Sequence, residues 1–246
     1  MKIEEFDGFD NSGLKRHKHV CDHDLSNIPF PLPGSDGGHF ALIISGKPKS
    51  GKSTLALGLL TSKGTNRVYR GKFDNIIIFV PKHSLSSLKN NPFADLSKDK
   101  QFHELTTETL AKAYKMIQDN ADNGETTLLY LDDMASSLKQ NMKTQELFNR
   151  ICFNRRHLKT SVMFLVQTFK SIPVNCRKTA SHIILFKNYN KLENTAVFEE
   201  IMFLDRDTTD KLFDYVYDKL HTFLYIDVHY GTLHKNFNPL IISNSE

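Results

Sequence analysis

Short apolar runs alternate with amphipathic segments along most of the chain. Runs rich in Ile, Leu, Val and Phe predict buried strands, and apolar residues spaced three and four positions apart predict helices. We expect strands near residues 40–45, 75–80, 127–132, 161–167 and 182–187, and helices near 52–62, 108–122, 143–157 and 191–203. This alternation is typical of an α/β fold, in which helices cover both faces of a mainly parallel central sheet.

The two ends of the chain depart from this pattern. Residues 1–37 are polar and irregular, and the prolines within 28–34 disfavour both helix and central strand. We therefore expect an N-terminal extension at 1–37, lying on the core or on a neighbouring subunit, and one domain at 38–246. After a predicted helix at 208–220, strands at 222–228 and 232–237 predict a C-terminal β-hairpin.

Composition and charge exclude few classes of protein. The net charge of +4 permits nucleic-acid binding without indicating it. No apolar stretch approaches the length of about 18 residues that a membrane span needs, and the first residues lack the apolar run of a signal peptide. Three scattered cysteines predict a reducing compartment. Cys21 lies among His17, His19 and His23, but the group lacks the second ligand pair of common zinc sites, so we expect a polar stretch there.

A glycine-rich pattern follows the first predicted strand. Residues 46–53 read G-x-x-x-x-G-K-S and lead into a helical segment, a context that disfavours a chance Gly/Lys-rich turn. The glycines let backbone N–H groups approach a polyphosphate, Lys52 is expected to reach the β- and γ-phosphates of ATP, and Ser53 to hold Mg²⁺. The predicted nucleotide-binding residues are Gly46, Lys47, Pro48, Lys49, Ser50, Gly51, Lys52, Ser53 and Thr54.

Two adjacent carboxylates end the predicted strand at 127–132. Asp132 is placed to orient Mg²⁺, and Asp133 stands where many P-loop ATPases carry the general base that activates water. A solvated acidic turn is the alternative, but the phosphate-binding pattern earlier in the chain favours the metal and base pair.

A polar amide and two arginines flank the strand at 161–167. In one large branch of P-loop ATPases, an extra strand between the Walker A and Walker B strands ends in a residue such as Gln167, which senses the γ-phosphate; a structural amide is the alternative. If the helix at 143–157 continues to its end, Arg155 faces the apolar side and Arg156 points outward. Alternatively, both arginines simply favour the negative end of that helix.

The chain resembles the FtsK–HerA superfamily over residues 38–240. The resemblance rests on these motifs together with the Arg156-His157 pair and the closing segments 225–227 and 236–238. Within this superfamily the chain is most similar to the poxvirus-type genome-packaging ATPases of large DNA viruses, virophages and related transposon-like viruses. Asp133 departs from the glutamate that the wider superfamily often has there.

The resemblance implies a RecA-like (ASCE) core and a homo-oligomeric ring, a pentamer or hexamer, that hydrolyses ATP to move double-stranded DNA into a preformed capsid. It implies that Arg156 acts in trans on a neighbour's ATP. A capsid portal or vertex protein would be the partner, in the host cytoplasm or viral factory and in association with virions.

DNA contacts and competing functions stay open. Movement along any sequence calls for phosphate contacts, for which Lys170, Arg177 and Lys178 are the candidates; a solvated basic loop is the alternative. A nucleoside or nucleotide kinase also uses a P-loop and an Asp-containing strand, but normally lacks the inserted strand. A helicase or partitioning ATPase of the same superfamily and a non-hydrolysing scaffold are further alternatives, the last disfavoured by the intact Lys52, Ser53, Asp132 and Asp133.

Overall fold

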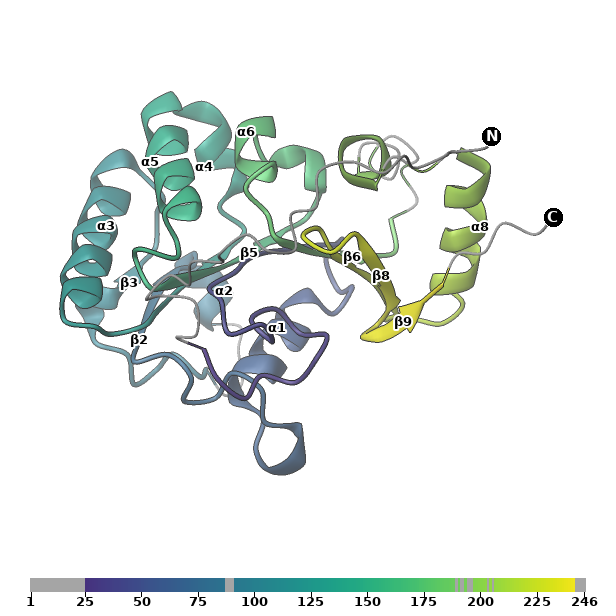
Figure 1. The fold of residues 1–246 in the computed structure, drawn as a ribbon. Coiled ribbons are helices and arrows are strands. Elements are labelled where there is room, and N and C mark those ends of the chain that lie inside the picture. Colours follow the sequence, from purple (N-terminus) through teal and green to yellow (C-terminus); the bar gives the residue numbers. More distant parts are fainter. Residues whose placement is uncertain are drawn as a thin grey trace, which may run out of the picture.

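The computed structural model describes residues 25–241, except 87–90, 189, 191–192, 194–196, 203 and 205. The group formed by Cys21 and its neighbouring histidines therefore lies outside the described residues. In the described part of the chain, helices pack on both faces of one large sheet (Figure 1).

Within the described residues the sheet has nine strands, in the order β3-β2-β4-β5-β1-β6-β7-β8-β9. The six strands from β3 to β6 in this order are parallel, and β7, β8 and β9 continue the sheet in antiparallel fashion. Their bounds are β1 (Ala41–Ser45), β2 (Asn75–Phe79), β3 (Gln101–Phe102), β4 (Thr127–Asp132), β5 (Thr160–Val166), β6 (His182–Phe186), β7 (Phe223–Asp227), β8 (Thr232–Lys235) and β9 (Asn238–Leu240).

Helices α3, α4, α5 and α6 cover one face of the sheet, and α1 and α2 cover the other (Figure 1). Their bounds are α1 (Lys52–Thr61), α2 (Lys82–Ser86), α3 (Thr107–Asp122), α4 (Ala135–Gln140), α5 (Met142–Phe153), α6 (Val174–Arg177) and α8 (Arg206–Val216). Short 3-10 helices occupy Gly64–Asn66, Lys98–Lys100 and Phe169–Ser171, and a π-helix occupies Phe198–Met202. None of the described helices is long and apolar enough to cross a membrane.

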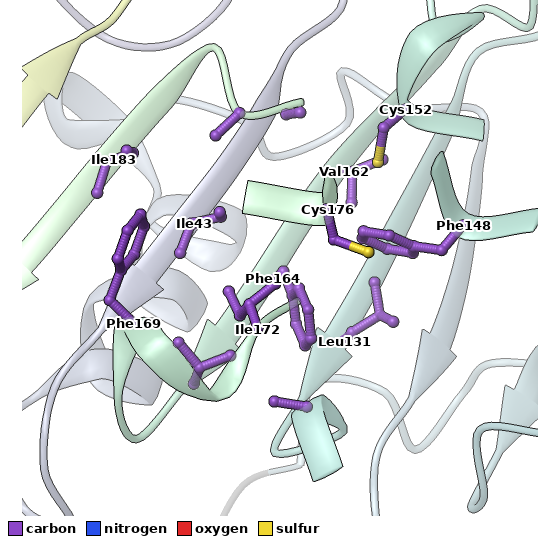
Figure 2. Close-up of a cluster of buried hydrophobic side chains, with 14 of the residues drawn as sticks. Ile43, Leu131, Phe148, Cys152, Val162, Phe164, Phe169, Ile172, Cys176 and Ile183 are labelled. Atoms are coloured by element: carbon purple, nitrogen blue, oxygen red, sulfur yellow. The ribbon is translucent and has the colours of Figure 1, made fainter. Parts of the chain in front are cut away.

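Two apolar cores hold these layers together. In the core under α3 to α6, Phe148 of α5 packs edge-on against Phe164 of β5, with ring centroids 5.5 Å apart, and the thiols of Cys152 and Cys176 lie among these side chains (Figure 2). Burial raises the pKa of both thiols to about 12, so they remain protonated and behave as small apolar groups. The strands pack on both faces, which explains why their sequences are apolar without alternation.

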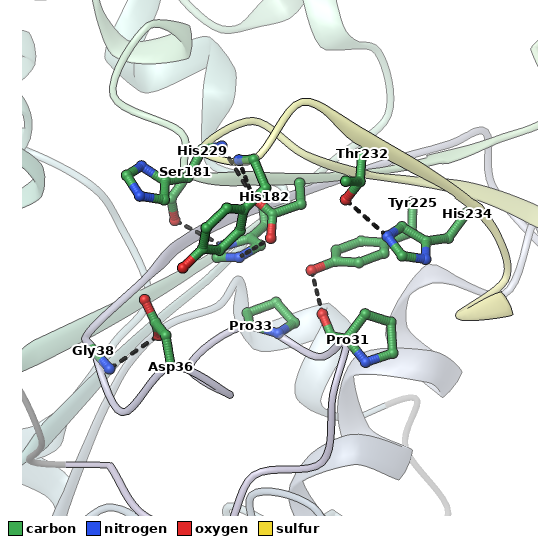
Figure 3. Close-up of polar contacts among 12 residues, drawn as sticks. Pro31, Pro33, Asp36, Gly38, Ser181, His182, Tyr225, His229, Thr232 and His234 are labelled. Carbon is green, nitrogen blue, oxygen red and sulfur yellow. Dashed lines mark hydrogen bonds and ion pairs between the residues drawn. The ribbon is translucent and has the colours of Figure 1, made fainter. Parts of the chain in front are cut away.

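The described part of the N-terminal segment packs against the second core. Leu25, Ile28 and Leu32 are buried beside α1. The hydroxyl of Tyr225 donates to the carbonyl of Pro31 at 2.6 Å (Figure 3), and that of Tyr69 to the carbonyl of Pro33 at 2.8 Å. Residues 25–36 thus lie on the same subunit's core, while the domain division at residue 37 stays a prediction.

The α/β architecture agrees with the sequence prediction, and the differences have local causes. The helix expected at 143–157 ends at Phe153, where Asn154 turns its side-chain amide back to the Arg150 carbonyl at 3.0 Å. The predicted C-terminal hairpin is β7 and β8, extended by β9 and joined to the sheet through β6. Of the helix expected at 191–203, the described residues contain the π-helix Phe198–Met202.

Candidate nucleotide site

The predicted phosphate-binding loop joins β1 to α1 at the carboxyl edge of the parallel strands. A Cβ on Gly46 would lie 2.6 Å from Ser50 Oγ and 2.7 Å from Phe186 Cβ, closer than real Cβ atoms come, so only glycine fits. Gly51 has φ of 108°, which also favours glycine. Both glycines of the motif are therefore required by the backbone path, and residues 46–54 form one compact loop and helix start.

Lys52 and Ser53, at the start of α1, lie beside Asp132 at the end of β4. The Ser53 hydroxyl donates to Asp132 Oδ2 at 3.2 Å, and Lys52 Nζ donates to the Lys47 carbonyl at 3.3 Å. Burial lowers the pKa of Lys52, although Asp132 and Asp133 oppose that shift. Burial likewise raises the pKa of Asp132, against the hydrogen bond from Ser53 and the charge of Lys52.

This donor set fits a magnesium ion. A hydroxyl and a carboxylate are the hard oxygen ligands that Mg²⁺ prefers. The raised pKa of Asp132 indicates a buried carboxylate whose negative charge is incompletely compensated, so a cation bound there would stabilise it.

Asp133 and Gln167 form a second polar pair beside the first. The Gln167 amide nitrogen lies 3.1 Å from each carboxylate oxygen of Asp133, so it donates to both. Asp133 has φ of 58°, and its N–H donates to the Leu165 carbonyl of β5 at 3.1 Å. Because β5 pairs with both β1 and β4, the strand ends bring Gln167 and Asp133 to the same edge as the phosphate-binding loop.

A pocket of about 250 Å³ joins these groups into one site. Lys52, Ser53, Asp132, Asp133 and Gln167 line its polar side. Apolar residues complete the wall: Leu57 of α1, Leu85 of α2, Tyr130 of β4, and Val80 and Phe93 from the segment after β2. A second cavity of about 510 Å³ is also lined by Asp133, so this residue lies between two cavities.

Sequence reasoning missed one residue at this site. His221, in the turn between α8 and β7, lies with Nδ1 2.9 Å from the carbonyl oxygen of Ser50 in the phosphate-binding loop. No motif marks this histidine, because its place at the site depends on a contact between residues 171 positions apart.

Arg156 lies at the amino ends of the parallel strands, on the side of the sheet opposite the phosphate-binding loop. It precedes the start of β5, whereas Gln167 follows the end of β5, and a strand of 7 residues separates the two edges by roughly 20 Å. There Arg155, Arg156 and Lys178 line a cavity of about 680 Å³, together with Asp36 and His182, which Figure 3 labels. The structure does not bring Arg156 to its own chain's phosphate-binding loop.

The two arginines differ as expected in exposure, but not for the expected reason. The predicted helix had to continue to residue 157, and α5 ends at Phe153. Arg155 is half-buried because its guanidinium donates to the carbonyls of His39 at 3.1 Å and Cys152 at 2.9 Å. Arg156 is exposed in the turn that follows α5.

Of the three DNA candidates, the structure speaks against Arg177. It is 7% exposed, its guanidinium pairs with Glu200 at 2.8 Å, and it lies 5.2 Å from the ring centroid of Phe169, so it supports the fold. Lys170 and Lys178 are exposed, but they lie toward opposite edges of the sheet, one shortly after β5 and the other shortly before β6.

Comparison with known proteins gives one family match and several structural ones. The model of the family described as poxvirus A32 protein matches residues 36–208. Two solved forms of the packaging enzyme B204 are similar at 16% identity. The DNA-packaging ATPase B204 from Sulfolobus turreted icosahedral virus has a TM-score of 0.58 and covers 81% of this chain and 97% of its own. The genome-packaging NTPase B204 from Sulfolobus turreted icosahedral virus 2, in complex with ATP-gammaS, has a TM-score of 0.57 and covers 82% and 98%.

A more distant likeness is EssC (ATPases 2 and 3) from Geobacillus thermodenitrificans, with a TM-score of 0.50 and 12% identity, covering 84% of this chain and 41% of that one. No curated protein matches the chain. At these identities the solved structures establish the fold, and they confirm the predicted P-loop architecture.

Proposed function

The chain belongs to the poxvirus A32 protein family, and from this premise we propose that it is a viral genome-packaging ATPase that moves double-stranded DNA. The observation that carries the proposal is the pair formed by Asp133 and Gln167 beside Lys52, Ser53 and Asp132. In this arrangement Lys52 would face the phosphates of a nucleotide, Ser53 and Asp132 would hold a metal ion, and Asp133 would lie beside the attacking water.

Each residue has a separate task in ATP hydrolysis. Phosphoryl transfer leaves little covalent work for a protein, so positioning and charge stabilisation dominate. Lys52 neutralises charge on the β- and γ-phosphates, and Asp133 aligns the attacking water and accepts its proton. Gln167, whose amide donates to Asp133, is placed to turn that amide toward the γ-phosphate. Ser53 and Asp132 would hold Mg²⁺, which supplies further charge neutralisation when bound.

The position of Arg156 supports a role on a neighbouring subunit. Because β5 separates it from its own phosphate-binding loop, it can meet an ATP only across an interface. Contacts between one edge of a subunit and the opposite edge of the next are heterologous, and they close into rings when the rotation allows. An arginine supplied in this way contributes on the order of 10³–10⁵ in rate in well-studied NTPases.

Mixed rings test this role. Arg156→Ala and Lys52→Ala subunits should each turn over ATP poorly alone, while their mixture should recover activity at interfaces that join an intact Lys52 to an intact Arg156. No recovery in rings confirmed to be mixed would contradict the trans role, and Arg155→Ala is then the next variant to test in the same mixture.

Lys170 is the stronger DNA candidate. It is exposed and lies three residues after Gln167, on the edge of the sheet that carries the phosphate-binding loop, and its N–H donates to Glu193 at 3.0 Å. Lys178 shares the cavity of Arg156 and would face the neighbouring subunit instead. Lys170→Ala should reduce the stimulation of ATP turnover by DNA. It should also lower the slope of log K for DNA binding against log salt concentration by about one. Lys178→Ala should leave both quantities unchanged.

The strand order argues against the kinase alternative. A nucleotide kinase normally has no strand between its Walker strands, and here β5 lies between β1 and β4 along its whole length. ATP turnover without a phosphate acceptor, raised by long duplex DNA, would distinguish the proposed motor from a kinase and from a scaffold. As a packaging motor it would act with a capsid portal or vertex protein, in the host cytoplasm or viral factory.

A further inference from the structure

The turn between α8 and β7 lies against the phosphate-binding loop. His221 is in this turn, and its Nδ1 lies 2.9 Å from the carbonyl oxygen of Ser50. Since a carbonyl can only accept, His221 must donate through Nδ1–H. A Cβ on Gly51 would lie 3.5 Å from the same nitrogen, so the imidazole lies next to the following residue of the loop.

Several contacts hold His221 in this place. The hydroxyl of Thr222 donates to the Lys219 carbonyl at 2.8 Å and closes the turn. On one side Tyr217 donates to the Leu185 carbonyl of β6 at 2.9 Å, and on the other Phe223 donates to the Asn236 side chain at 3.2 Å. His221 thus lies in a turn that hydrogen bonds fix on both sides.

The backbone of His221 is itself in an uncommon conformation. Its φ of 66° lies in the left-handed region, which costs free energy for a side chain of this kind. Such a conformation persists where surrounding contacts maintain it, and here it directs the imidazole at the phosphate-binding loop.

The geometry of a peptide gives this contact a consequence for phosphate binding. In a trans peptide the C=O and the following N–H point in opposite directions. Fixing the Ser50 carbonyl toward His221 therefore fixes the Gly51 N–H away from it. Because Gly51 has the conformational freedom of glycine, this peptide would otherwise rotate readily.

We propose that His221 is a positioning residue of the nucleotide site: its Nδ1–H holds the Ser50–Gly51 peptide so that the Gly51 N–H faces a phosphate group of the bound nucleotide. The inference rests on the proposed function, because it assumes that residues 46–54 bind a nucleoside triphosphate. On this proposal, the turn that leads into the C-terminal antiparallel strands contributes to the affinity of the site for the nucleotide.

Three variants separate the hydrogen bond from backbone strain. His221→Gly removes the donor and is at ease with a positive φ. His221→Asn keeps an N–H the same number of bonds from Cβ as Nδ1, and asparagine tolerates the left-handed region better than most residues. Leu220→Ala is the matched control, because Leu220 is in the same turn and is 85% exposed.

The probe is ATP-gammaS, and its Kd is measured by calorimetry well below the lowest melting temperature of the four proteins. His221→Gly should bind it about fivefold more weakly, which corresponds to about 1 kcal/mol. His221→Asn and Leu220→Ala should stay within about twofold of the wild type. In steady-state assays the loss should be in KM, with kcat nearly unchanged, because chemistry at Asp133 is not altered.

Equal Kd values for His221→Gly and the wild type would overturn the inference, as would an equal loss in His221→Asn and His221→Gly. A wild-type protein that does not bind ATP-gammaS would instead contradict the proposed function, so the two failures are distinguishable.

Discussion

Adding a single methyl group at Gly46 should both destabilise the protein and weaken nucleotide binding. The new Cβ would lie 2.6 Å from Ser50 Oγ and 2.7 Å from Phe186 Cβ. Phe186 is 4% exposed and belongs to β6, which is paired on both sides, so its Cβ cannot move without shifting a central strand. Overpacking of this kind costs about 1–3 kcal/mol. At 2 kcal/mol, the melting temperature of a chain of this size falls by about 4–8 °C.

Gly58→Ala is the matched control for this experiment. Gly58 lies in the interior of α1, and a Cβ there would meet nothing within 4 Å. Alanine should therefore stabilise the helix by about 0.5–1 kcal/mol. Thermal unfolding followed by circular dichroism, without nucleotide, compares the two variants, and ATP-gammaS binding is then measured at a temperature where both are folded. If Gly46→Ala melts at or above the wild type, or if both glycines respond alike, the described path of the loop is wrong.

Three further predictions test the neighbouring groups. Burial raises the pKa of Asp132 above its ordinary value of 3.8, so the stability of the wild type falls as pH rises through the raised pKa. Asp132→Asn should therefore raise the melting temperature without nucleotide at pH 7, and raise it less near pH 4. The same variant should no longer be stabilised by Mg²⁺ and ATP in these thermal scans. Asp133→Asn should bind ATP-gammaS normally but stop turnover, because an amide cannot accept the proton; lost binding would make Asp133 the metal ligand. Arg177→Ala should cost about 1–3 kcal/mol in denaturant unfolding, because it removes a buried side chain that packs on Phe169 and pairs with Glu200, whereas the exposed Lys170→Ala should change stability by less than about 0.5 kcal/mol.

The path of the candidate nucleotide site can be predicted from the sequence because local constraints determine it. Gly46 and Gly51 are required by the path of a few residues, and the apolar run of β4 positions Asp132 and Asp133 at its end whatever the rest of the fold does. The role of Gln167 depends on one additional fact, the place of β5 between β1 and β4, which the resemblance supplies and the strand order confirms.

Long-range pairing accounts for what the sequence did not predict. Arg177 is a charged residue of the kind that usually lies at the surface. Its burial is explained by the ion pair with Glu200 of the π-helix, which the sequence does not indicate. The end of α5 was misplaced because Leu158 continues the apolar period beyond Phe153, although Asn154 caps the helix. His221 could not be identified, since an isolated histidine in a turn gives no sign of the loop it contacts.

The central claim, that this chain is a DNA-dependent packaging motor, is tested most directly by its ATP turnover in the presence and absence of long duplex DNA. The assay compares the assembled wild type with Lys52→Ala under identical salt, because phosphate contacts weaken as salt rises. We expect wild-type hydrolysis to rise several-fold with DNA and Lys52→Ala to remain at background. A wild-type protein that hydrolyses no ATP, or whose rate is the same with and without DNA, would contradict the account.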